Sequence, residues 1–578
     1  MCSIAFAISC MLGAVADDVE ISFDIWDWTA PCQDMDTFDR WVTDLATLGV
    51  TRVEISVPWR ALEPEPGHID LHWLEERLQI IKRHGLGARL RINSYYAGAT
   101  PDWYAGALWQ ADENRPDALA LPSIADERFW EHYGPLCTAI AAHCRGMDVQ
   151  FNAFIGVHAE LKWGDWWHYD DAALAVWRDA ITEPRPAWLR DVVGDGVSLP
   201  ERPPIPPATT GKPDRDPTNR AVIAFREWLW RDAVRRFTEA IRQGDPDAVI
   251  SAPLGESYRI QSAQMGNLDY WGLTRGANHV VHSYDFFQHG TDGAWEAGAS
   301  VAAFRGITGL PVCFEYDGEE STLGLGYSMP HLLAIGRHAM RAGAGLKVAN
   351  YSYHRELPSE KQVLTKLVTL WRSDMPRAPF VPDHNADRSN TVLLFFSKWS
   401  NYSYREPANA HGFGWLHDAQ FGVYKLFQDL GIPTRIICED NLGEDLSGYK
   451  ALVMALSPAA LMPASAQEQL AALTLPRIAD YDDIPPLHDN TTPREAEGIA
   501  TVRIASPAAP IGPADLAALG TAYQYGLQTP DTRLAAYQPG HVVLGYPIGL
   551  VYQEDPHTYT HQGLMLWAIQ QATASANQ

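Results

Sequence analysis

Between residues 19 and 353, short apolar runs alternate with longer segments whose apolar residues recur every three or four positions. Short apolar runs are typical of buried parallel strands, and the longer recurrence is typical of amphipathic helices that cover them. The runs predicted as strands lie at 19–26, 52–59, 87–93, 150–157, 248–254, 279–286, 311–316 and 346–353. Eight strands with intervening helices predict a (β/α)8 barrel.

Two of the helical patterns, 38–49 and 72–85, end in Gly, which is a helix C-terminal signal. The connections after the third, fourth and sixth strands are long, and the Pro-rich segment 199–217 predicts an irregular loop. Loops that follow barrel strands lie on the face where barrel enzymes keep their active sites. We therefore expect any active site at that face.

A second alternation begins near residue 390 and predicts a smaller, doubly wound α/β domain. Its predicted strands lie at 391–397, 434–439, 449–456, 501–506 and 541–546, and its helices at 419–431, 465–473 and 563–573. No G-x-G-x-x-G follows its first strand, so we expect no dinucleotide or other cofactor. The expected domains are therefore a catalytic barrel at 17–385 and the α/β domain at 386–578.

The first 16 residues are an apolar stretch that ends in Ala14-Val15-Ala16, a small-x-small cleavage pattern. A possible export leader at 1–16 predicts a periplasmic or secreted protein. A cytoplasmic location is the alternative, because no Lys or Arg precedes the apolar stretch.

The net charge of −26 argues against nucleic acid and anionic membrane as partners, because both select a basic face. No later apolar run is long enough to span a membrane. The 7 Cys include no C-x-x-C pair, so no metal site is expected. The 21 Trp and 23 Tyr favour a neutral, ring-shaped ligand such as a sugar, since flat aromatic faces stack on sugar rings.

Acidic residues at the ends of barrel strands are the first catalytic candidates. Strand alternation places Glu315 and Asp317 on the inward face of the seventh strand, and Val312 and Phe314 on the outward face. Glu54 lies early and deep in the second strand, which makes it a weaker candidate.

Glu160 follows the fourth apolar run, and several Trp residues come soon after it in the sequence. Apolar surroundings raise the pKa of a carboxyl group, which suits a general acid. Glu160 and Glu315 across one barrel mouth form the pair of carboxylates that glycoside hydrolysis requires.

The segment 52–92 resembles the glycoside hydrolases of clan A and is most similar to family 42 β-galactosidases. Those enzymes carry a W-x-x-x-E-P-x-x-G-x-x-D pattern, which stands here as Trp59, Glu63, Pro64, Gly67 and Asp70. The resemblance implies an exo-acting, retaining hydrolase of β-glycosidic bonds.

Within this resemblance, Glu160 takes the position of the acid/base and Glu315 that of the nucleophile. It also implies that the second domain is similar to the family's glutamine amidotransferase-like trimerisation domain, and hence a homo-oligomer, either a dimer or a trimer.

One departure is Ala159, which stands where the clan usually has Asn before its acid/base. Two alternatives therefore stay open: an inverting glucan hydrolase of β-amylase type, and a non-catalytic carbohydrate-binding barrel. Further residues at predicted strand ends are expected to hold the hydroxyl groups of an oligosaccharide or glycoside substrate. They are Trp26, Asp27, Arg91, Asn93, His158, Trp163, Glu256, Tyr284, Asp317 and Tyr351.

Overall fold

The structure of the chain is a computed structural model. It describes residues 20–25, 34–94, 98–110, 121–153, 155, 167–207, 209, 213–255, 269–284, 294–317, 329–350, 358–373, 387–404, 415–480, 500–502, 535–538, 541–544, 548–549, 552 and 558–574. For some residues inside these ranges only the backbone is described.

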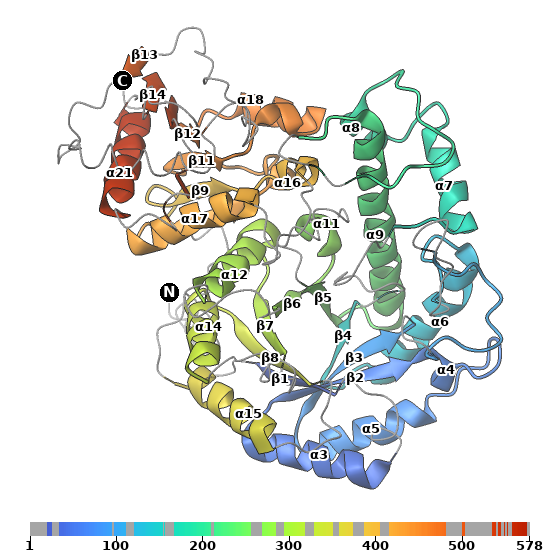
Figure 1. Cartoon of the computed structure of the whole chain (residues 1–578). Helices are drawn as coiled ribbons and strands as arrows, with labels where there is room; N and C mark the ends of the chain where they lie inside the picture. Colours follow the sequence, from blue (N-terminus) through green and yellow to red (C-terminus); the bar gives the residue numbers. More distant parts are fainter. Residues whose placement is uncertain are drawn as a thin grey trace, which may run out of the picture.

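Eight parallel strands close into a barrel in chain order, with helices outside them (Figure 1). The strands are β1 (Ile21–Ile25), β2 (Arg52–Pro58), β3 (Gly87–Asn93), β4 (Val149–Asn152), β5 (Val249–Gly255), β6 (His279–Tyr284), β7 (Val312–Asp317) and β8 (Gly345–Asn350). Closure comes from β8, which pairs with both β7 and β1. The predicted (β/α)8 barrel is confirmed, with each predicted strand present.

The barrel helices are α3 (Met35–Leu48), α5 (His72–Arg83), α6 (Glu127–Cys144), α9 (Pro217–Gly244), α11 (Tyr270–Leu273), α12 (Trp295–Thr308), α14 (Met329–Arg341) and α15 (Pro358–Trp371). Two of them, α3 and α5, lie where the patterns at 38–49 and 72–85 predict them, and each of the others also follows a barrel strand. The connections also hold α4 (Trp59–Leu62), α7 (Asp171–Ile181) and α8 (Ala187–Val193).

The helix α3 shows how the local sequence sets these boundaries. Asp34 caps its start by accepting a hydrogen bond from the backbone of Asp36, and Gly49 ends it with a φ of 90°. Its buried residues recur with helical spacing, so one face packs on the barrel while the other stays polar. The Gly that ends the helical pattern in the sequence is thus the residue that ends the helix.

The second unit contains a seven-stranded sheet in the order β10-β9-β11-β12-β15-β14-β13. Its strands are β9 (Val392–Phe395), β10 (Thr434–Ile437), β11 (Ala451–Ala455), β12 (Arg477–Asp480), β13 (Ala500–Val502), β14 (Ala535–Gln538) and β15 (His541–Leu544). The pairs that involve β14 are antiparallel and the others are parallel. Its helices are α16 (Lys398–Ser403), α17 (Trp415–Asp429), α18 (Ala464–Ala472) and α21 (Thr558–Ala574), with 3-10 turns η4 (Glu439–Asn441) and η5 (Ala459–Leu461).

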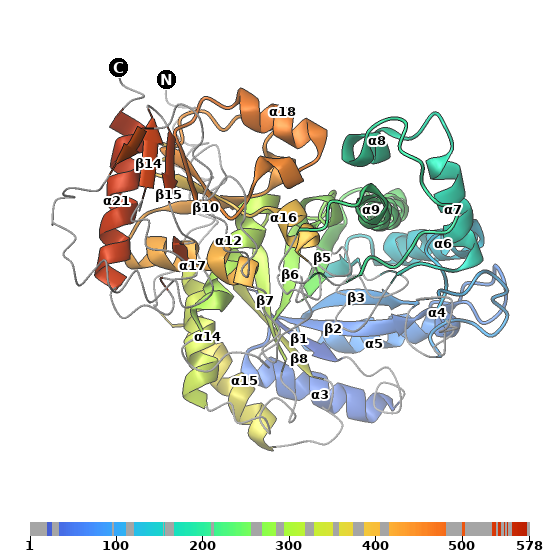
Figure 2. The ribbon, with the colours of Figure 1, turned by 45° about the horizontal axis from the view of Figure 1, so that its top comes forward.

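The two units pack closely where α12 meets β10 (Figures 1 and 2). A Cβ atom on Gly306 would lie 2.2 Å from the carbonyl oxygen of Ile436, so only Gly permits this approach. Asn441 donates a hydrogen bond to the carbonyl of Ile307 at 2.9 Å, and Arg435 donates one to the carbonyl of Gly306 at 3.0 Å. One hydrophobic cluster contains residues of both units, so the core continues across this contact.

A buried charge cluster joins the same two units. The ammonium of Lys398, at the start of α16, lies 2.6 Å from Asp440 in its own unit. It also lies 3.2 Å from Glu227 of α9 and 3.1 Å from Asp269, both in the barrel. Arg231 of α9 forms a further ion pair with Asp269. The cluster therefore ties α9 and the start of α11 to the second unit.

Candidate active site in the barrel

The inward faces of the strands carry an unusual number of charged side chains. In β7, Glu315 points into the barrel, where it contacts Lys347 of β8. The preceding residue, Phe314, faces outward and packs against His282 at 5.7 Å between ring centroids. The inward orientation predicted for Glu315 from strand alternation is confirmed.

Lys347 links three carboxylates inside the barrel. Its ammonium lies 2.6 Å from Glu315, 3.0 Å from Glu54 and 3.5 Å from Asp24. Lys347 and Glu54 have no exposed side-chain surface, and Glu315 is only 3% exposed. A buried ammonium is stable only when it is paired with anions in this way. Although burial lowers it, the pKa of Lys347 is raised well above its ordinary value by these three carboxylates.

Arg91 and Asn152 hold Glu54 from the other side. The Arg91 guanidinium lies 2.7 Å from both Glu54 and Asp24, and the Asn152 amide donates to Glu54 at 2.8 Å. Burial raises the pKa of Glu54, but Lys347, Arg91 and Arg89 together hold it well below its usual range. Arg91, predicted to bind substrate, is therefore engaged in the ion cluster.

Asp24 differs from Glu54 in its electrostatics. Burial is its largest influence and raises its pKa to about 6, against the lowering effect of Arg91 and Lys347. One of its carboxylate oxygens has no hydrogen-bond partner among the described residues. Asp24 is thus the acid of this cluster that gains a proton most readily near neutral pH.

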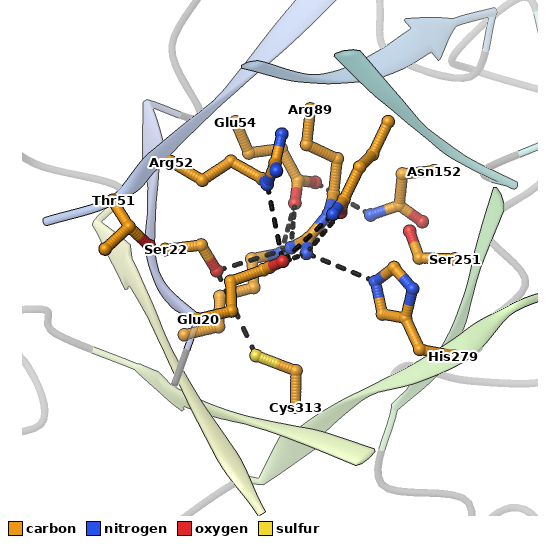
Figure 3. A network of polar contacts seen from close by, with 12 residues as sticks. Glu20, Ser22, Thr51, Arg52, Glu54, Arg89, Asn152, Ser251, His279 and Cys313 are labelled. Carbon is orange, nitrogen blue, oxygen red and sulfur yellow. Dashed lines mark hydrogen bonds and ion pairs between the residues drawn. The ribbon is translucent and has the colours of Figure 1, made fainter. Parts of the chain in front are cut away.

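A second layer of polar contacts lies nearer the start of the strands and is centred on Arg89 (Figure 3). Arg89 forms ion pairs with Glu20 and, at 3.4 Å, with Glu54, and it donates to Gln150 at 2.9 Å. Burial raises the pKa of Glu20, but Arg89 and other neighbours lower it to about 2. Burial and Arg89 lower the pKa of His279 to about 3, so its ring is neutral at pH 7.

The two layers together balance in charge when all members are ionised. Inside the barrel, four carboxylates (Glu20, Asp24, Glu54 and Glu315) face four cations (Arg52, Arg89, Arg91 and Lys347), and Arg52 also pairs with the exposed Asp148. Glu315 and Asp24 each stand fourth in their strands, and Glu54 stands third. The barrel wall holds the carboxyl group of Glu315 on a rigid strand, as a nucleophile requires.

Several predicted site residues can be placed only in part. Asn93 is fully buried at the end of β3. Tyr284 ends β6 and Asp317 ends β7, where the backbone alone is described. Outside the described residues lie Glu160, Trp26, Asp27, His158, Trp163, Glu256 and Tyr351, together with Ala159.

Sequence reasoning missed Lys347 and Asp24 and gave Glu54 little weight. The available signal was a polar or charged residue at every second position of otherwise apolar runs, as in 19–26 and 87–93. Such spacing places the charges on the inward face of a strand. Among the described residues, no group of three or more His, Cys, Asp and Glu side chains is arranged to hold a metal ion.

The W-x-x-x-E-P-x-x-G motif forms a hydrogen-bonded unit after β2. Glu63 is buried and accepts hydrogen bonds from the indole of Trp59 at 2.6 Å and the backbone of Gly67 at 2.8 Å. His132 of α6 lies 3.1 Å from the same carboxylate, and Gly67 adopts a φ of 74°. The motif therefore fixes the turn between β2 and α5.

Replacing Glu63 by Ala should lower the free energy of unfolding by about 2–4 kcal/mol, because it leaves a buried indole N–H without its acceptor. Urea denaturation of the purified variant measures this loss. Glu65→Ala, at an exposed position two residues on, is the control and should differ from the wild type by less than about 0.5 kcal/mol. Equal stability of the two variants would show that the motif does not hold the turn.

Comparison with known proteins bears on the same part of the chain. The family model of glycoside hydrolase family 42, described as beta-galactosidase, matches residues 27–122. The match spans β2, β3 and the hydrogen-bonded motif that joins them. The chain is similar to the family 42 glycoside hydrolases. The resemblance stated from residues 52–92 is thus confirmed.

Solved structures of β-galactosidases share the fold. A β-galactosidase from the psychrophilic Marinomonas ef1 is 13% identical, with a TM-score of 0.61 over 96% of this chain and 91% of that one. The enzyme from the Antarctic haloarchaeon Halorubrum lacusprofundi is 16% identical, with a TM-score of 0.56 over 80% of this chain and 73% of that one. The cold-adapted β-galactosidase from Rahnella sp. R3 is 15% identical, with a TM-score of 0.56 over 81% and 72%.

At these identities the likeness is one of fold. None of the curated proteins compared with the sequence matches it. Among the described helices, none is both long and apolar enough to cross a membrane.

Proposed function

We propose that this chain is a glycoside hydrolase that cleaves a β-glycosidic bond, with Glu315 as the nucleophile and Glu160 as the acid/base. The family 42 match over residues 27–122 supports a hydrolase of this class. Glu315 is proposed as the nucleophile because it points inward from β7 and contacts Lys347.

The chemistry follows from this geometry. An ionised Glu315 attacks the anomeric carbon of the substrate, and the leaving oxygen takes a proton from Glu160. A covalent glycosyl-enzyme forms, and water then releases the sugar with its original anomeric configuration. The Lys347 ammonium, 2.6 Å from Glu315, holds the carboxylate in place on β7.

A panel of nitrophenyl glycosides and natural oligosaccharides tests the activity, and β-galactosides are the first substrates to try. Glu160→Ala should lose about a hundredfold to ten-thousandfold in rate on a natural disaccharide, whose leaving group needs a proton. The loss should be smaller on a nitrophenyl glycoside, because nitrophenolate leaves without protonation. Equal losses on both substrates would contradict an acid role for Glu160.

Proton NMR of the first-formed product distinguishes the retaining mechanism from the inverting alternative. Retention is expected when the two carboxyl groups lie about 5 Å apart, and inversion when they lie roughly 6.5–9.5 Å apart. If the product first appears with the opposite anomeric configuration, the mechanism is inverting, and Glu315 acts as a general base instead of a nucleophile.

The seven-stranded sheet after residue 386 supports, as part of this proposal, a glutamine amidotransferase-like domain with a role in assembly. The boundary at 385/386 and a dimer or trimer are proposed on the same basis. The proposed leader at 1–16 would direct the protein to the periplasm or outside the cell. Its substrate is an oligosaccharide or glycoside.

A further inference from the structure

A buried arginine on α9 has no hydrogen-bond acceptor among the residues that the structure describes. Arg226 is 2% exposed, and its Nε, Nη1 and Nη2 atoms all lack a partner among the described residues. The guanidinium lies over the face of Trp167, with its central carbon 5.3 Å from the ring centroid. Burying a guanidinium without an anion is costly, so the described part of the chain leaves this charge uncompensated.

The other arginines of α9 show that the helix is ordinarily able to pair its cations. Arg231, Arg235 and Arg236 each form ion pairs with carboxylates. Arg220 donates to the carbonyl of Leu461, and Arg242 to that of Gly276. Arg226 is the exception among the six arginines of this helix.

Two neighbouring side chains also offer unused polar atoms at this place. His168 is 5% exposed and both of its ring nitrogens lack a partner among the described residues. Trp230, one helical turn after Arg226, is 2% exposed and its indole N–H lacks an acceptor in the same part of the chain. The rings of His168 and Trp230 lie 6.0 Å apart between centroids. The cluster therefore offers several hydrogen-bond donors and no anionic acceptor of its own.

Nearby carboxylates do not supply that acceptor. Glu227, the next residue on α9, turns away to Lys398 and to the hydroxyl of Tyr402, which donates to it at 2.7 Å. Burial lowers the pKa of Arg226 to about 9, as expected for a cation without a counter-ion. Burial and Arg226 lower the pKa of His168 to about 3, so its neutral ring still has one N–H to donate.

We propose that Arg226, His168 and Trp230 form a buried binding site for a single oxyanion group, namely a carboxylate, sulfate or phosphate. The planar fork of a guanidinium matches two oxygens of such a group, and the imidazole and indole N–H groups add two further donors. Two sources can supply it: a small free anion, or the carboxylate of an acidic sugar. This site does not depend on the proposed hydrolase activity.

Thermal unfolding of the full chain in an oxyanion-free buffer, followed by titration, tests the site. Sulfate, phosphate and acetate represent free anions, galacturonate represents an acidic sugar, and galactose is the neutral control. Saturating oxyanion should raise the Tm of the wild type by at least about 3 °C, whereas galactose at the same concentration should not. Binding of galacturonate more tightly than acetate would identify the acidic sugar as the source, and the reverse order would identify the free anion.

Arg226→Met removes the charge but keeps much of the volume, and should bind the same anions at least about tenfold more weakly. In oxyanion-free buffer its Tm should equal or exceed that of the wild type, because an unpaired buried charge is gone. Arg226→Lys keeps the charge without the fork and should bind with intermediate affinity. Arg235→Met, at a half-exposed and paired position on the same helix, is the matched control and should bind anions as the wild type does.

Two results would overturn the proposal. One is an anion response that is absent from the wild type or unchanged in Arg226→Met. The other is an Arg226→Met protein that is several degrees less stable than the wild type without oxyanions, since this would reveal a partner inside the chain. If Arg226→Met does not fold, the comparison of Arg226→Lys with the wild type decides, and equal affinities would count against the site.

Discussion

Glu315→Gln should reduce the rate of glycoside hydrolysis by at least about a thousandfold, on nitrophenyl and natural substrates alike. The amide of Gln has nearly the shape of the carboxylate but cannot attack the anomeric carbon. The loss should appear in kcat, because the substrate can still bind. Steady-state kinetics of the purified variant on each substrate cleaved by the wild type measures it.

The uniform loss is what separates Glu315 from Glu160. An acid/base variant is partly relieved by a leaving group that departs without a proton, whereas a nucleophile variant is not. Circular dichroism and thermal unfolding should show that Glu315→Gln is folded, since Gln fills the same space and Lys347 keeps Glu54 and Asp24 as ion-pair partners. Glu319→Gln, two residues beyond the end of β7, is the companion variant and should keep the wild-type rate. If Glu315→Gln kept the full rate, the nucleophile would have to be another residue.

Lys347→Met should lower the free energy of unfolding at pH 7.5 by about 3–5 kcal/mol. The change leaves Glu54 and Glu315 without the ammonium that lies 3.0 Å and 2.6 Å from them. Breaking a buried ion pair by removing one partner is costly because the remaining charge stays out of water. Urea denaturation measures the loss, and the rate of hydrolysis should fall with it because Glu315 loses its support.

The loss in Lys347→Met should depend on pH in a defined direction. In the wild type the pKa of Glu54 is lowered on folding, so the stability from its ionisation is present above the unfolded pKa and disappears as the pH falls. Without Lys347 the pKa of Glu54 is lowered less on folding. The variant therefore loses free energy of unfolding at higher pH, where Glu54 is ionised, and loses less of it at low pH. The deficit relative to the wild type should therefore be larger at pH 7.5 than at pH 4.

Lys425→Met provides the comparison, since Lys425 forms an exposed pair with Asp429 on α17. Such pairs contribute little, so this variant should lose no more than about 0.5 kcal/mol and show no marked pH dependence. A Lys347→Met protein as stable as Lys425→Met at both pH values would show that the barrel cluster is not held by Lys347.

The barrel could be predicted from the sequence because its signals are local. Each of its strands is a compact apolar run, and the Gly residues that end α3 and follow α5 are visible in the sequence. Two strands of the second sheet, β12 and β14, were missed. The segments 477–480 and 535–538 are short and only partly apolar, so their pairing partners, not their composition, make them strands.

The inward direction of Glu315 also followed from local alternation, but its contact with Lys347 did not. That contact depends on the register between β7 and β8, which pairs Glu315 with Lys347 across the sheet. Glu54 reaches the same ammonium from the far side of β1. Register and barrel closure arise from the whole fold, so a single sequence shows which residues face inward but not which charges meet.

The position of Lys398 has a consequence for where the chain could be cut. A fragment that stopped after the barrel would keep Glu227 and Asp269 but lose the ammonium that lies 3.2 Å and 3.1 Å from them. It would also uncover the surface around Gly306 that β10 now covers. A truncated barrel would therefore leave Glu227 and Asp269 to share Arg231, beside apolar surface newly exposed to water. Residues 387–404 and 434–441 thus belong to the barrel's own folding unit.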